Sequence, residues 1–140
     1  MKKGIKFLYL PQPSGRNYTE SLGPDPDYYD MLTNYITGNI MGSKRTCEEL
    51  LQSIKEIEAG KLDEDERSGN VCSITINKHV VEINMSVGKG KIQETIYPLW
   101  IFKQAIEEWY DFLQTGRERE IEFDYEPQEH EKTRYYEGVI

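Results

Sequence analysis

The sequence predicts an α+β fold: an antiparallel sheet, made of a three-stranded meander with N- and C-terminal strands, packed by two main helices. Two observations support this prediction. Residues 70–97 contain three runs rich in β-branched residues, separated by turn residues, as in a meander. Residues 98–116 follow with apolar side chains at the three- and four-residue spacing of an amphipathic helix, which would cover the apolar face of the sheet.

The N-terminal part begins with a predicted strand at residues 5–10, which Pro11 and Pro13 would end. Residues 11–27 hold four of the six prolines and predict an irregular loop. A further strand is predicted for residues 120–126, where apolar and acidic residues alternate. The sequence leaves open whether the first strand joins the meander or pairs with this last strand in a separate sheet.

Two helices are predicted between the N-terminal loop and the meander. The first begins after Asp27, which can cap it, and stops near Gly38. The second begins at a capping residue, Ser43 or Thr46, and ends at Gly60. Its apolar side would pack in the core with the long helix that follows the meander.

Length and charge limit the classes of function that this chain can have. The 140 residues predict one domain, residues 1–140, which ends in an acidic segment, residues 117–140. The net charge is −8, which argues against nucleic acid or an anionic membrane as a partner because both are bound by clustered lysines and arginines. A basic protein partner suits this charge, although solubility alone also explains it. No apolar run approaches the roughly 20 residues of a membrane span or forms a signal peptide, so a cytoplasmic protein is expected.

No motif for catalysis, cofactor binding or metal binding is found. Cys47 and Cys72 fit no zinc or redox spacing and predict reduced residues in or near the core. His79 falls in a hairpin turn and His130 in the acidic tail, with no nucleophile presented beside either. The glycine–lysine stretch at residues 88–91 links two strands and is explained by a hairpin turn. We therefore predict no catalytic, cofactor-binding or metal-binding residues.

Tyrosine is the one residue type in excess, with 10 of 140 residues. Tyr buries a large area at low entropic cost and keeps a polar tip, so protein interfaces are enriched in it. Tyrosines and carboxylates are interleaved in the acidic segment, and a predicted charged connector, residues 61–69, holds four more carboxylates. Alternatively, the connector is only solvated and each tyrosine lies at the edge of the core. The predicted partner-binding residues are Asp63, Glu64, Asp65, Glu66, Glu122, Asp124, Tyr125, Glu126, Tyr135 and Tyr136.

After the meander the chain reads Tyr-Pro-Leu-Trp-Ile-Phe-Lys-Gln-Ala-Ile-Glu-Glu-Trp-Tyr-Asp-Phe-Leu. This aromatic helix, the meander and charged helix before it, and the acidic tail resemble the immunity proteins of bacterial polymorphic toxin systems, including those of contact-dependent growth inhibition. The resemblance covers residues 43–116. It implies a non-enzymatic inhibitor that binds its cognate toxin domain, commonly a basic nuclease, and covers the active site or substrate surface. The resemblance assigns no binding residue to this chain.

Three hypotheses follow, in order of preference. The first is a toxin-neutralising protein, a monomer or weak dimer, that binds a basic nuclease domain through its acidic, tyrosine-rich surface. The second is an enzyme of unrecognised type, which needs a cleft near His79, Cys47 or Cys72. The third is a structural or adaptor domain that associates through an exposed sheet edge.

Overall fold

The structure is a computed structural model that describes residues 3–10, 16–24 and 26–138. Its elements, in chain order, are β1 Gly4–Leu10, β2 Arg16–Ser21, α1 Asp30–Tyr35, a π-helical turn Ile36–Ile40, α2 Lys44–Glu58, β3 Glu64–Ser68, β4 Ser73–Asn77, β5 Val80–Gly88, β6 Lys91–Pro98, α3 Leu99–Thr115, β7 Arg119–Glu122, a 3₁₀ turn Glu129–Glu131 and β8 Arg134–Glu137.

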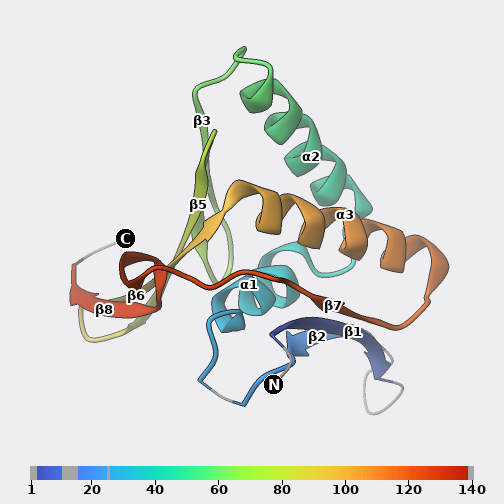
Figure 1. Ribbon diagram of the computed structural model, residues 1–140, viewed down its shortest axis with the longest axis horizontal. Coiled ribbons are helices and arrows are strands. Elements are labelled where there is room, and N and C mark those ends of the chain that lie inside the picture. Colours follow the sequence, from blue (N-terminus) through green and yellow to red (C-terminus); the bar gives the residue numbers. More distant parts are fainter. Residues whose placement is uncertain (1–2, 11–15, 25, 139–140) are drawn as a thin grey trace.

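The described strands form two antiparallel sheets, and the α+β prediction is confirmed (Figure 1). One sheet has the order β2-β1-β7 and the other the order β3-β4-β5-β6-β8. The first strand therefore pairs with the strand after α3, in a separate sheet from the meander. The predicted meander is present as β4, β5 and β6, and β8 extends it on the β6 side.

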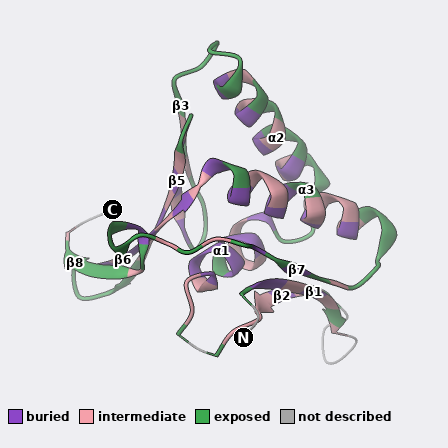
Figure 2. Cartoon of the chain, in the orientation of Figure 1, coloured by how far each residue is buried: buried purple, intermediate pink, exposed green. Residues whose placement is uncertain are grey.

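Helix α3 lies at the centre of the fold, between α2 and the three-stranded sheet in Figure 1. Its buried side contacts β1, because the Phe7 ring lies 5.0 Å from that of Trp109 and 5.7 Å from that of Phe112, measured between ring centroids. The buried residues of both sheets and of all three α-helices form one cluster. Buried and exposed residues lie on opposite sides of α2 and α3 (Figure 2). The predicted amphipathic helix is confirmed, and it ends at Gly116, whose φ of 69° is left-handed.

Tyr97 fixes the start of α1 on the five-stranded sheet. Its side chain, on β6, is fully buried, and its hydroxyl donates to the Tyr28 carbonyl at 2.7 Å and accepts from the Leu32 amide at 3.0 Å. The Leu32 N–H belongs to the first turn of α1, where the backbone offers it no partner. Next to it, the Tyr28 hydroxyl donates to the Ile96 carbonyl of β6. These contacts hold the start of α1 against β6.

Three predicted boundaries are wrong. The structure forms β2 within the predicted N-terminal loop, and it forms β3 within the predicted connector at residues 61–69. The strand predicted for residues 120–126 ends at Glu122. The predicted strand breakers Pro11 and Pro13 lie outside the described residues.

The predicted stop at Gly38 is also wrong, because the chain continues through it as the π-helical turn. A Cβ on Gly38 would lie 2.5 Å from Cγ2 of Val71, so this glycine allows the close approach of Val71. Helix α2 begins after Ser43, whose side chain accepts from the Thr46 amide, and this resolves the two predicted caps in favour of Ser43. Gly60, at a φ of 78°, follows the end of the helix as predicted.

Candidate partner-binding surface

One face of the five-stranded sheet is turned away from the helices. Residues directly opposite each other on antiparallel strands share a face, so the register defines its members. One row across the sheet runs from Glu66 through Thr75 and Glu82 to Ile96, and the next includes Glu94 and ends at Arg134. We call this the open face; its polar and charged members are Glu64, Glu66, Ser68, Ser73, Thr75, Asn77, Glu82, Asn84, Ser86, Glu94, Arg134 and Tyr136.

The open face is acidic. Its described strand residues include four glutamates and one basic residue, Arg134. The Arg134 guanidinium donates from Nε to Glu94 Oε1 at 2.9 Å and lies 5.5 Å from the centroid of the Tyr136 ring. Glu94 is only 6% exposed, so this ion pair is largely desolvated on the carboxylate side. Burial, and then the neighbouring Glu94, raise the pKa of Glu82 above its ordinary value.

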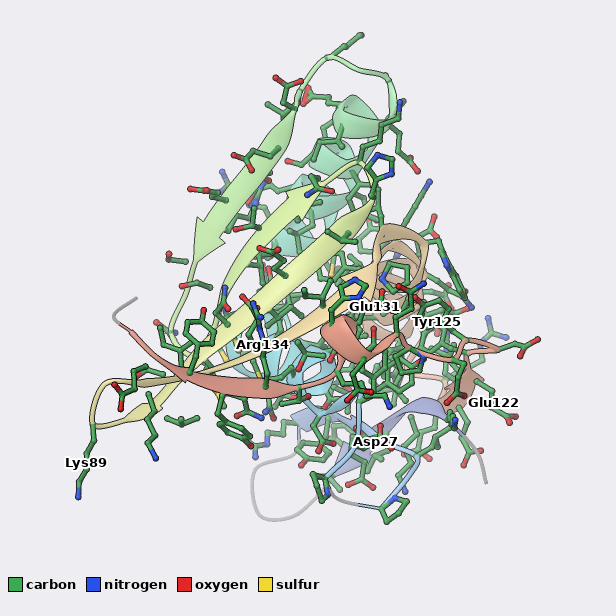
Figure 3. All side chains as sticks on the ribbon, turned by 60° about the vertical axis from the view of Figure 1, so that its left-hand side comes forward. Asp27, Lys89, Glu122, Tyr125, Glu131 and Arg134 are labelled. Atoms are coloured by element: carbon green, nitrogen blue, oxygen red, sulfur yellow. The ribbon has the colours of Figure 1, made fainter. Side chains whose placement is uncertain are left out.

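The predicted residues of the acidic segment form a group beside α3. Glu122, Asp124 and Glu126 are exposed and line, with Tyr125, a depression of about 400 Å³. The Tyr125 hydroxyl donates to Glu131 Oε1 at 2.6 Å, and burial raises the pKa of Tyr125 to about 12. In Figure 3 these two side chains lie together, between Arg134 and Glu122 in the view.

The two neighbouring tyrosines of β8 lie on opposite faces of the sheet. Tyr136 pairs with Ile92 and belongs to the open face, whereas Tyr135 pairs with Gln93 and belongs to the other face. Tyr135 is 64% exposed. With Tyr125 it lines a pocket beside α1. Tyr135 therefore lies in the group of the acidic segment, whereas Tyr136 lies on the open face.

The four carboxylates of the predicted connector lie at the other edge of the same sheet. Glu64 and Glu66 belong to the open face, whereas Asp65 lies on the opposite face, where it pairs with Arg67 at 2.7 Å. Asp63 precedes the strand and is exposed. Since three strands separate β3 from β8, the two edges are about 19 Å apart at ~4.8 Å per strand. The ten predicted residues therefore form two groups, linked only by the open face.

Sequence reasoning missed Trp100, Glu82 and Glu94. Trp100 is 48% exposed, and its ring lies 6.1 Å from that of Tyr125. Trp100 lies outside the spacing of the buried side chains of α3, and this position in the sequence indicates an exposed aromatic residue. Glu82 alternates with buried residues along β5, whereas Glu94 is itself buried on β6, and their assembly into one face required the strand register.

The groups considered for catalysis are not assembled into a reactive site. A wide depression of about 620 Å³ includes His79, with Glu58, Lys103 and Trp100, but no serine, threonine or cysteine lines it. Cys47 and Cys72 are free and buried, as predicted, and burial raises the pKa of each thiol to about 11. Both therefore remain protonated and poorly nucleophilic at neutral pH.

No protein-family model, curated protein or solved structure matches this chain. Within the described part of the chain, no three His, Cys, Asp or Glu side chains are placed to share a metal ion. None of the described helices is both long and apolar enough to cross a membrane.

Proposed function

We propose that this chain is a binding protein that neutralises a cognate toxin, a basic nuclease domain, by forming a stoichiometric complex through its acidic, tyrosine-rich surface. The observation that supports this most is the open face, where four glutamates and one arginine lie on a sheet surface that no helix covers in Figure 3. A field of one sign on one partner speeds encounter with a partner of the opposite sign.

The exposed aromatic residues supply the second requirement of an interface. Tyr136 lies on the open face, and Trp100 and Tyr135 are exposed near the acidic segment. Trp, Tyr and Arg are enriched among the residues that contribute most of the binding energy of interfaces, in well-packed pockets from which the surrounding contacts exclude water. Two free, buried cysteines also agree with action in a reducing compartment such as the cytoplasm.

The test is a titration of the purified chain against a basic nuclease domain of a candidate toxin, by calorimetry at low and at physiological salt. We expect a one-to-one complex whose affinity falls as salt rises. Co-expression should protect cells from the toxin domain. Absence of a complex at low salt would contradict the proposal.

A matched pair of variants tests the assignment to the open face. The double variant Glu64→Gln and Glu66→Gln removes two charges from it, and Glu56→Gln with Glu107→Gln removes two charges from the helices. We expect the first pair to slow association several-fold more than the second. Equal effects would show that total charge, and not the open face, directs the encounter.

A further inference from the structure

A pocket of about 440 Å³ lies where the start of α1, strand β6 and the C-terminal segment meet. Tyr28, Tyr29, Tyr125 and Tyr135 line it, together with Asp27. Its volume lies within the range of ligand-binding pockets. We refer to it below as the tyrosine pocket.

One buried polar group at the tyrosine pocket has no partner. Tyr29 is 2% exposed, and its hydroxyl makes no hydrogen bond to any described residue. The charged and phenolic groups that act on this hydroxyl are Asp27, Tyr125 and Glu126, which all line the pocket. The hydroxyl is itself fully buried, so it lies behind the wall of the pocket, and the two charged groups that act on it, Asp27 and Glu126, are both acidic.

The ionic groups of the pocket favour a cation. Asp27 Oδ1 accepts from the Tyr29 amide at 2.9 Å, and its other oxygen has no partner among residues 3–10, 16–24 and 26–138. The two lysines at the pocket are already paired, Lys3 with Glu126 at 2.7 Å and Lys132 with Glu129 at 3.2 Å. A phosphate would therefore meet an unpaired carboxylate, whereas a cation would pair with it.

We infer that the tyrosine pocket receives a guanidinium group, supplied by an arginine side chain of the basic partner; this inference rests on the proposed function. A guanidinium is planar and stacks on aromatic rings, here those of Tyr125 and Tyr135. Its N–H groups would donate to the free oxygen of Asp27. A purely apolar ligand would leave this oxygen buried and unpaired, which is unfavourable.

The experiment titrates the full chain, without any toxin, with N-acetyl-arginine amide and follows amide and tyrosine-ring signals by NMR. N-acetyl-citrulline amide is the matched probe, because its urea group has nearly the same shape and no charge. We expect saturable shifts at Tyr29, Tyr125 and Tyr135 with the arginine probe. The citrulline probe should bind about tenfold more weakly, the ratio expected when a charge-assisted hydrogen bond becomes neutral.

Three variants connect the response to the pocket. Asp27→Asn keeps the acceptor for the Tyr29 amide but removes the charge, and it should lower the affinity for the arginine probe about tenfold. Asp63→Asn makes the same change in the exposed loop before β3 and should leave the affinity unchanged. Tyr29→Phe keeps the ring and removes a hydroxyl that lies behind the pocket wall, so it should leave the affinity nearly unchanged. Unchanged spectra elsewhere would show that each variant is folded.

Several results would overturn the inference. They are the absence of saturation by the arginine probe, equal binding of the citrulline probe, shifts confined to the open face, and an affinity that Asp27→Asn leaves unchanged. Because no toxin is present, failure here is distinct from failure of the proposed function. If a toxin complex forms while the arginine probe does not bind, the pocket is not an arginine-binding site, and the proposed function still stands.

Discussion

Tyr29 and Tyr97 are buried tyrosines whose hydroxyls differ in one respect: that of Tyr97 donates to Tyr28 and accepts from Leu32, and that of Tyr29 has no described partner. Removing an unpaired buried hydroxyl relieves its desolvation cost, so we expect Tyr29→Phe to raise the free energy of unfolding by about 1 kcal/mol. Tyr97→Phe should lower it by about 1–3 kcal/mol, because it leaves the Leu32 amide unpaired. Urea unfolding measures both, and equal losses would contradict the assignment of partners.

Glu82 gives a prediction about pH. Burial and Glu94 raise its pKa in the folded state, so between the ordinary and the raised pKa the folded chain binds more protons than the unfolded chain. The contribution of Glu82 to stability is therefore lost as the pH rises through this interval. We expect Glu82→Gln to increase the free energy of unfolding at pH 7, with a gain that shrinks as the pH falls toward 4. Urea unfolding at several pH values measures it, and a gain independent of pH would contradict this account.

At the scale of elements, the π-helical turn Ile36–Ile40 is tied to the residues before β4 by one side chain. Asn39 Oδ1 accepts from the amides of Val71 and Cys72, both at 3.1 Å, and Nδ2 donates to the Cys72 carbonyl at 2.8 Å. We expect Asn39→Ala to lower the free energy of unfolding by about 2 kcal/mol, since three hydrogen bonds are lost. Asn34→Ala, on the exposed side of α1, is the control and should change it little. Chemical denaturation measures both, and similar effects would contradict the role of Asn39.

The elements also separate what the sequence could predict from what it could not. The meander and α3 carry their own apolar periodicity, which local sequence reasoning detects. Strands β2 and β3 read Arg-Asn-Tyr-Thr-Glu-Ser and Glu-Asp-Glu-Arg-Ser, with few apolar residues, because each is an edge strand held by hydrogen bonds to one neighbour. Each of the two pairs with the adjacent strand in the sequence through backbone hydrogen bonds, which need no apolar side chains, so composition does not reveal them.

The same limit applies to the candidate surface. The sequence predicts a connector for residues 61–69, and a connector gives its four carboxylates no defined direction. Strand β3 gives them one: Glu64 and Glu66 lie on the open face, and Asp65 is turned toward Arg67. Tyr135 and Tyr136 are separated by the same alternation. Residue types therefore indicated an acidic, aromatic surface, while strand pairing decided which residues share a face.

At the scale of the whole molecule, charge and aromatic residues should act on different steps of binding. The double variant Glu64→Gln and Glu66→Gln should slow association with the toxin domain and reduce its salt dependence, because long-range charge acts on encounter. Trp100→Ala should instead speed dissociation, with a loss of about 2 kcal/mol or more in binding free energy, as for an aromatic hot spot.

Stopped-flow or surface-binding kinetics at two salt concentrations separates these two effects. Thr115→Ala, at the far end of α3 from Trp100, is a control that should leave both rates unchanged. If Trp100→Ala altered only the association rate, or neither rate, the aromatic group beside Tyr125 would lie outside the interface. The acidic open face would then carry the complex alone, and the binding free energy would follow ionic strength much more steeply, because exposed charges are screened by salt.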